Sequence, residues 1–343
     1  MDLWQYLKQT KKPIVLYGMG NGADKIIAVL ESRGIEYKGV FASDGFQKEK
    51  LFHGHKITGY SALQEKFVDM IVLLCFGSAR EEVRQNVLKI AAEQELYAPE
   101  VAVVGGGLFC EEFYLANKER FDRVYNMLAD DISKKTFECI INYKLSGNID
   151  YLLECEVDDD EPYESFLKLS DNEVFMDLGA YTGDTVADFV NRVKDYKSII
   201  AAEPDIKNFR KLQNGVKGLH NTEIHNVGIT DICGKKPFSM RGGRNSSTDK
   251  ATSEIEFLNI DALSQIDLPT YIKMDIEGEE VRAIKGAAAT ISQAKPKMLI
   301  SAYHRTEDLF AIPEAVNEIR SDYKIYIRHF KSLPAWDTNF YFI

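Results

Sequence analysis

Two blocks of the sequence alternate short apolar runs with segments of helical periodicity, and this alternation constrains the fold more than any other feature. The first block covers residues 13–110, and the second begins at Glu173. In the first block, helical patterns separate apolar runs at 14–17, 37–41 and 70–76. Strands that alternate with helices form a parallel sheet with crossover helices. We therefore predict an α/β protein whose smaller N-terminal domain is Rossmann-like.

The second block predicts a larger sheet. Its apolar runs lie at 173–178, 198–202, 222–229, 254–260, 270–276, 297–303, 323–330 and 339–343. Helical patterns follow several of them, notably at 183–194 and 279–292. Only a short loop containing proline separates the last two runs, which favours an antiparallel hairpin. We predict a mostly parallel, seven-stranded Rossmann-like sheet with this hairpin at one edge.

Between the two blocks, from Glu111 to Leu169, the rhythm stops and the pattern becomes helical. A chain of 343 residues exceeds the usual size of one domain. We predict an N-terminal domain at 1–112, a helical connector at 113–170 and a C-terminal domain at 171–343. The three adjacent carboxylates at 158–160 indicate a solvated loop rather than a metal site, because they cannot all turn towards one ion.

Composition limits the partners. The net charge of -11 provides no basic field for a phosphate backbone, so we do not expect nucleic acid as a partner. The five cysteines are scattered, without metal-ligand spacing, which indicates reduced thiols. The N-terminus resembles no signal peptide and no window is long enough to span a bilayer, so we expect a cytoplasmic protein without membrane insertion. The composition is compatible with a homo-oligomer.

The most informative local feature is the segment V-F-M-D-L-G-A-Y-T-G-D-T at 174–185, a buried strand, a glycine turn and the start of a helix. Such a turn brings backbone close to a ligand at the carboxyl edge of a sheet. An Asp ends the strand where the dinucleotide fingerprint has its first glycine. A carboxylate there suits a ligand with cationic groups, such as the ammonium and sulfonium of S-adenosylmethionine. The candidate cofactor-binding residues of this segment are Asp177, Gly179, Ala180, Tyr181, Gly183, Asp184 and Thr185.

The ends of the next two strands add further cofactor candidates. Glu203 and Pro204 follow the run at 198–202, about twenty residues beyond the glycine turn, where an acceptor of ribose hydroxyls is typical. Asn226, Val227 and Gly228 reach the same edge one strand later, where adenine commonly lies in such folds. The alternative interpretation is a plain α/β turn in which Asp residues cap helices.

A fourth strand, with the sequence Y-I-K-M-D-I-E-G-E-E at 271–280, ends in carboxylates. The D-L-G-A at 177–180 with Gly183, the E-P at 203–204, this K-x-D-x-E-G-x-E segment and the I-K-G-A at 284–287 together resemble the FkbM methyltransferase family over residues 173–303. The segments 128–133 and 301–305 also resemble longer members that carry an additional N-terminal domain.

The resemblance implies a Rossmann-like methyltransferase sheet and an O-methyltransferase that uses S-adenosylmethionine. The expected acceptor is a hydroxyl of a sugar or another small natural product. Because the sulfonium is already a strong electrophile, the protein must mainly position the acceptor and remove its proton.

Asp275, Glu277 and His304 are the candidate catalytic residues that could take this proton. The ordinary pKa of histidine, near 6.5, favours His304 as the base, although a histidine at a strand end can also be structural. Asp275 could instead bind the cofactor. Asp275 and Glu277 could also hold a divalent metal, which we do not expect because the spacing reveals no third oxygen ligand. A favourable helix dipole explains Glu279 and Glu280.

Glycine-containing turns in other parts of the sequence allow alternative functions. The G-M-G-N-G at 18–22, with Asp44 at the end of the next strand, could bind a nucleotide or belong to a scaffold. On that basis the chain could be an NAD-dependent oxidoreductase or epimerase. A further alternative is a non-catalytic nucleotide-binding protein whose methyltransferase fold holds the cofactor without turning it over. The glycines at 105–107 indicate a flexible strand exit. The polar loop at 242–247 could close over the donor or the acceptor.

Overall fold

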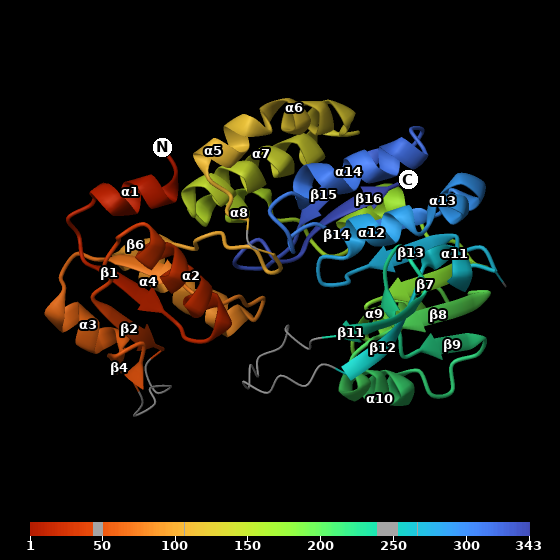
Figure 1. The fold of residues 1–343 in the computed structure, drawn as a ribbon, viewed down its shortest axis with the longest axis horizontal. Coiled ribbons are helices and arrows are strands. Elements are labelled where there is room, and N and C mark those ends of the chain that lie inside the picture. Colours follow the sequence, from red (N-terminus) through yellow and green to blue (C-terminus); the bar gives the residue numbers. More distant parts are fainter. Residues whose placement is uncertain (44–50, 106, 239–252, 266) are drawn as a thin grey trace.

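The structure is a computed structural model, and it describes residues 1–43, 51–105, 107–238, 253–265 and 267–343. Asp44 and the loop at 242–247 lie outside the described residues. Two α/β bodies stand side by side, with a layer of helices above and between them (Figure 1). This arrangement confirms the predicted fold class.

The N-terminal sheet has six strands in the order β3-β4-β2-β1-β5-β6, all parallel except the pair β3 and β4. Its strands are β1 (Ile14–Tyr17), β2 (Gly39–Ala42), β3 (Leu51–Phe52), β4 (His55–Gly59), β5 (Ile71–Leu74) and β6 (Glu95–Tyr97). Its helices are α1 (Leu3–Gln9), α2 (Asn21–Ser32), α3 (Tyr60–Lys66) and α4 (Glu81–Glu93). Ile14 and Leu16 pack with α1 and α2, whereas Val15 and Tyr17 pack with α3 and α4. Alternation along β1 thus requires helices on both faces.

The connector consists of α5 (Glu111–Ala116), α6 (Lys118–Met127), α7 (Asp131–Ser146), α8 (Asp150–Cys155) and a π-helical turn at Tyr163–Leu167. It packs on the C-terminal sheet, where the N–H of Ile327 donates to Ser133 Oγ at 3.1 Å. The fully buried Arg328 donates to Asp130 at 2.7 Å and to Glu161 at 2.6 Å. These bonds fix the start of α7 and the segment before the π-helical turn to the hairpin.

The C-terminal sheet has seven strands in the order β15-β16-β14-β13-β7-β8-β9. The strands are β7 (Val174–Leu178), β8 (Ser198–Ala202), β9 (Thr222–His225), β13 (Tyr271–Met274), β14 (Lys297–Ser301), β15 (Ile325–His329) and β16 (Thr338–Phe342). Strand β16 is antiparallel to both of its neighbours, and the other neighbours are parallel. The predicted seven strands and the terminal hairpin are confirmed.

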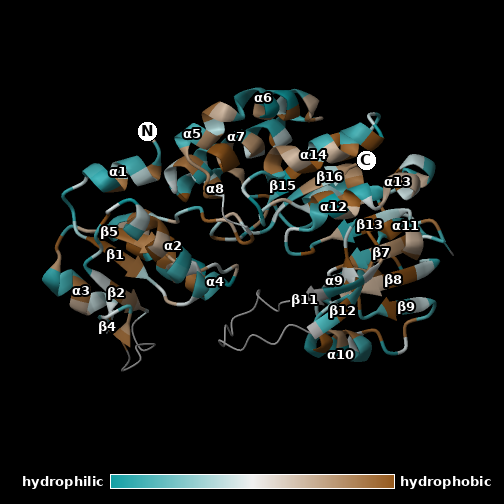
Figure 2. Ribbon diagram, in the orientation of Figure 1, coloured by the Kyte–Doolittle hydropathy of each residue, from teal (hydrophilic) through white to brown (hydrophobic). Residues whose placement is uncertain are grey.

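Helices cover both faces of this sheet. They are α9 (Asp184–Arg192), α10 (Ile206–Gly215), α11 (Ile260–Leu263), α12 (Glu280–Lys285), α13 (Ala288–Ala294) and α14 (Asp308–Ile319). Phe175 and Tyr271 pack with α9 and α10, whereas Met176 and Met274 pack with α12, α13 and α14. The strands of the N-terminal sheet are coloured as hydrophobic in Figure 2, whereas the outer helices α1 and α6 show much hydrophilic colour.

Two segments differ from the sequence expectation. The run at 222–229 bends after β9 because the side-chain amide of Asn226 bonds to the carbonyls of Glu203 and Pro204. The chain then enters a separate sheet of β10 (Gly228–Ile229), β12 (Ser253–Leu258) and β11 (Gly234–Phe238). The predicted helix at 279–292 is two helices, broken where Gly286 packs against Thr230 so closely that a Cβ would lie 2.7 Å from its carbonyl oxygen.

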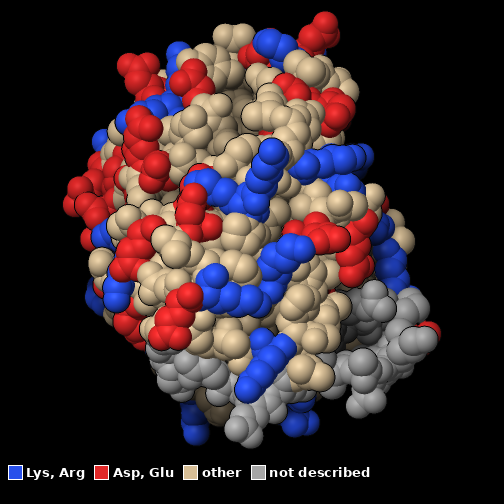
Figure 3. All heavy atoms as spheres, turned by 90° about the vertical axis from the view of Figure 1, so that its left-hand side faces the viewer, with Lys and Arg blue, Asp and Glu red and all other residues tan. Residues whose placement is uncertain are grey.

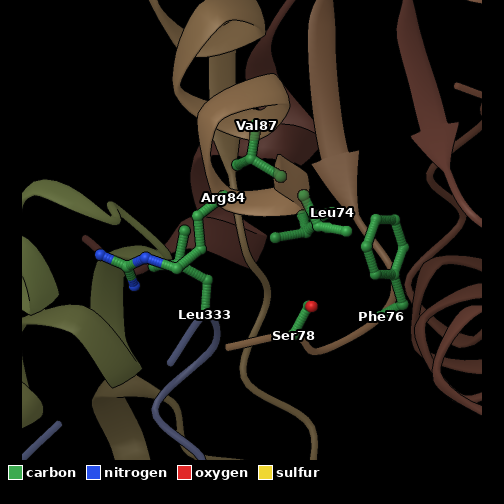
Figure 4. Close-up of a pocket in the computed structure, with 7 residues that line it drawn as sticks. Leu74, Phe76, Ser78, Arg84, Val87 and Leu333 are labelled. Carbon is green, nitrogen blue, oxygen red and sulfur yellow. The ribbon is translucent and has the colours of Figure 1, made fainter. Parts of the chain in front are cut away.

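The two bodies contact each other where the loop before β16 meets the exit of β5. Ser78 and Leu333 form an antiparallel bridge, and Leu333 lies among Leu74, Ser78 and Arg84 (Figure 4). A Cβ on Gly77 would lie 2.4 Å from the ring of Trp336. The C-terminal half of the chain therefore packs on the carboxyl end of the N-terminal sheet.

Among the described residues, no helix combines the length and apolar character needed to cross a membrane. On the face drawn in Figure 3, basic and acidic side chains of the described residues are interspersed.

Candidate active site

The glycine turn after β7 lies at the centre of the carboxyl edge of the C-terminal sheet. The N–H groups of Gly179 and Ala180 both donate to the carbonyl of Ala202 at 3.0 Å. Gly179 and Gly183 have φ values of 81° and 89°, and even Tyr181 has a φ of 47°. The turn therefore stays tight against β8, and α9, which carries Asp184 and Thr185, starts from it.

Asp177 is buried beneath this turn. Its Oδ1 lies 3.3 Å from Nζ of Lys273, which also donates to the carbonyl of Gly179 at 2.9 Å. Burial raises the pKa of Asp177, against the lowering effect of Lys273. Neither carboxylate oxygen has a hydrogen-bond partner among the described residues. The structure thus places Asp177 against a lysine, and direct contact with a cofactor stays a prediction.

Glu203 lies beside the turn with its carboxylate held by backbone. Its Oε2 accepts from the N–H of Tyr181 at 2.9 Å, and its Oε1 accepts from the N–H of Asp205 at 2.8 Å. Burial raises the pKa of Glu203. Asn226 is tied to the Glu203 and Pro204 carbonyls, and Val227 is buried next to it. The predicted cofactor residues of three strands therefore meet at one edge, with Gly228 starting β10.

Asp275, Glu277 and His304 meet at the ends of the adjacent strands β13 and β14. Nε2 of the buried His304 lies 3.3 Å from Asp275 Oδ1 and 3.9 Å from Glu277 Oε2. The hydroxyl of Tyr303 donates to Asp275 at 3.2 Å. Burial lowers the pKa of His304, but the surrounding carboxylates outweigh it and raise the value to about 9. With this pKa, His304 is protonated at neutral pH. A protonated histidine cannot accept the acceptor proton, which weakens the sequence argument that His304 is the base.

Glu280 is a site residue that sequence reasoning missed. It is fully buried, and its Oε1 lies 3.0 Å from Nδ1 of His304. The same oxygen accepts from the N–H of Ile276 at 3.0 Å and of Gly278 at 3.3 Å. From the sequence, the helix dipole was enough to explain an acidic residue at position 280. The only signal for a role in the site was the position of Glu280 in the K-x-D-x-E-G-x-E-E segment. Glu279, in contrast, is partly exposed and pairs with Arg282.

A segment of the N-terminal half lies against this site. The N–H of Val104 donates to the carbonyl of His304 at 2.9 Å. Lys25 on α2 donates to the carbonyls of Ala102 at 2.8 Å and Val103 at 2.5 Å. The glycines at 105–107 were predicted to be a flexible exit, but a Cβ on Gly107 would lie 2.7 Å from Thr306. The described part of this segment, residues 101–105 and 107–108, therefore forms part of the wall around the candidate catalytic residues.

Two of the three glycines in the N-terminal turn, Gly18 and Gly22, have a packing explanation. A Cβ on Gly18 would lie 2.4 Å from the ring of Phe76, and a Cβ on Gly22 would lie 2.4 Å from the carbonyl oxygen of Cys75. The hollow next to Gly22 is also lined by Pro334 and Trp336 of the other half. Packing thus accounts for Gly18 and Gly22, whereas Gly20 has a φ of 105° and no atom within 4 Å of its Cβ position.

The strand order, the antiparallel β16 and a glycine turn at the carboxyl edge define the C-terminal half as a Rossmann-like methyltransferase fold. Residues 177–325 match the model of the methyltransferase FkbM domain. The chain therefore carries an FkbM methyltransferase domain, as the motifs predicted, and is a methyltransferase.

One solved structure matches nearly the whole chain. The crystal structure of methyltransferase FkbM from Methylobacillus flagellatus KT is 25% identical, with a TM-score of 0.78, and the match covers 99% of this chain and 92% of that chain. Precorrin-6y C5,15-methyltransferase from Geobacter metallireducens GS-15 is 12% identical, with a TM-score of 0.36, over 53% of this chain and 84% of that chain. The second likeness is too low to carry an argument. No curated protein matches the sequence.

Proposed function

We propose that the protein is an S-adenosylmethionine-dependent O-methyltransferase that acts on a hydroxyl of a sugar or another small natural product. One observation carries this proposal. The glycine turn that would hold the cofactor packs directly on the backbone of Asp275, one of the three candidate catalytic residues. A donor bound at the turn would therefore have its reactive end beside Asp275, Glu277 and His304.

Methyl transfer to a hydroxyl requires that the protein position the methyl acceptor and provide a base for the hydroxyl proton. The bound donor supplies a sulfonium whose methyl carbon is attacked by the acceptor oxygen, so that an O–CH₃ bond forms, the S–CH₃ bond breaks and its electron pair returns to sulfur. The hydroxyl proton leaves the oxygen and needs a base. Glu277 supports this role because its side chain is 60% exposed and lies at the open side of the site.

Glu203 supports the assignment of the donor. Its oxygens each accept one backbone N–H, and a carboxylate oxygen has further lone pairs that could accept ribose hydroxyls. It ends the strand next to the glycine turn, which is the place that such an acceptor takes in nucleotide-binding α/β folds.

The test is calorimetric titration of the full chain with S-adenosylhomocysteine. We expect micromolar binding that Glu203→Gln weakens at least about tenfold, because a lost charged hydrogen bond costs about 1.5–3 kcal/mol. The matched control is Glu223→Gln on β9, an exposed carboxylate that should leave binding unchanged. NADH should not bind. Failure of the unaltered chain to bind S-adenosylhomocysteine, or binding of NADH in its place, would overturn the proposal.

A further inference from the structure

The ends of β13 and β14 bring more carboxylates around His304 than one imidazole can neutralise. Asp275 and Glu277 face Nε2, and Glu280 faces Nδ1. Donor atoms of Asp275, Glu280 and His304 all lie within 4.8 Å of one another. A protonated His304 contributes only one positive charge beside these three carboxylates, and Lys25 acts on Glu277 at longer range. The nearby Lys273 is already paired with Asp177.

We propose that Asp275, Glu277 and Nε2 of His304 bind a divalent cation, and that Glu280 orients the histidine for it. A metal-binding histidine usually gives its second ring N–H to a carboxylate, which fixes the ring and its tautomer. Glu280 has this place, since its Oε1 is held by two backbone N–H groups and lies 3.0 Å from Nδ1. Nε2 would bind the ion after losing its proton.

The cluster has a buried part and a solvent-exposed part, and a cation site requires both. His304 and Glu280 are almost fully buried, which makes the orienting pair rigid. Asp275 and Glu277 have side chains that are 33% and 60% exposed, so the cation could be reached from solvent and could keep open positions for oxygen ligands. The buried Nε2 aimed at two carboxylates is the observation that separates this cluster from an ordinary acidic surface.

The ligand set indicates the type of ion. Two carboxylates with one imidazole and open positions suit Mn²⁺ or a similar first-row divalent ion better than Ca²⁺, which prefers a larger set of oxygens. Bound beside the donor, such a cation would coordinate the acceptor oxygen and make its proton more acidic, and the oxygen of Glu277 that does not bind the ion would take this proton. This catalytic role rests on the proposed function, whereas the binding of the cation does not.

The experiment is a titration of the chelator-treated full chain with Mn²⁺, followed by electron paramagnetic resonance of the free ion. We expect one bound Mn²⁺ per chain, and an affinity that falls at least about tenfold in Glu277→Gln and about 10–100-fold in Glu280→Gln. Glu279→Gln is the matched control, because Glu279 belongs to the same turn but pairs with Arg282 and Thr230.

Two results would overturn the proposal: no stoichiometric binding by the unaltered chain, or equal affinity in Glu277→Gln and Glu279→Gln. S-adenosylhomocysteine binding is measured on every variant and shows whether each one is folded. Retained S-adenosylhomocysteine binding without Mn²⁺ binding rejects the cation site and leaves the proposed function standing. Mn²⁺ binding by a chain that does not bind S-adenosylhomocysteine supports the cation site and rejects the proposed function.

Discussion

The carbonyl oxygen of Asp275 lies 1.8 Å from the point that a Cβ atom on Gly179 would occupy. The left-handed backbone of Gly179 adds to this constraint. We expect Gly179→Ala to lower the free energy of unfolding by about 3 kcal/mol or more, since overpacking and backbone strain act together. Urea unfolding followed by circular dichroism measures the loss.

Gly218 provides the control for this change. It also has a positive φ, of 92°, but no atom lies within 4 Å of its Cβ position. Gly218→Ala should therefore cost only about 1 kcal/mol, the strain of the backbone alone. Equal losses in the two variants would show that the contact with Asp275 does not constrain the turn.

Arg328 joins the connector to the C-terminal hairpin through Asp130 and Glu161. We expect Arg328→Met to destabilise the chain by about 2–4 kcal/mol, because two carboxylates lose their partner while keeping some access to water. Thermal unfolding gives the change. Arg320→Met, which removes the exposed pair with Asp322, should cost less than about 1 kcal/mol. A similar loss in both variants would contradict a structural role for the buried arginine.

His329 makes the folded state sensitive to acid. Burial, together with Arg84, lowers its pKa to about 3. The histidine stays neutral in the folded chain but gains a proton in the unfolded chain below about pH 6.5, so its contribution to stability is present above pH 6.5 and is lost as the pH falls towards 3. Between pH 7 and pH 5 the loss is on the order of 1–2 kcal/mol.

The measurement compares unfolding free energies at pH 7 and pH 5 for the unaltered chain and His329→Gln. The variant should lose less stability on acidification, because a glutamine does not titrate. His220→Gln, at an exposed position, should retain the full dependence. Identical pH dependences of the unaltered chain and His329→Gln would refute the assignment.

Lys25 ties the N-terminal half to the candidate catalytic residues by holding the segment that bonds to the His304 carbonyl. We expect Lys25→Met to raise the hydrogen-exchange rate of the Val104 amide about tenfold, since the lost charged bonds are worth about 1.5–3 kcal/mol. Lys38→Met, which removes an exposed pair with Glu36, should leave that amide unchanged. An unchanged Val104 amide in Lys25→Met would show that the segment is held by other contacts.

Local pattern predicted the strands, the hairpin and the edge where the cofactor and catalytic candidates meet. This succeeded because each feature depends on a short stretch, such as the carboxylates that follow β13 directly. The bend at Asn226 was missed because it depends on carbonyls contributed by another strand.

The role of Glu280 could not be inferred because its partner, His304, follows a different strand, and a dipole explained the acid locally. The contact of Val104 with His304 joins residues 200 positions apart, which no periodicity reports. The assignment of the individual site residues therefore stays a prediction until ligand binding is measured.

Strand β16 pairs with β14 on one side and β15 on the other, although it follows both in the sequence. While the chain is being made on a ribosome, the edges of β14 and β15 cannot be joined until residue 342 has emerged from the exit tunnel. The N-terminal sheet is complete long before that point. The edges of β14 and β15 therefore stay unpaired in the nascent chain until β16 is added. Because unpaired strand edges can pair with other chains, slowed or truncated translation at this hairpin would favour aggregation.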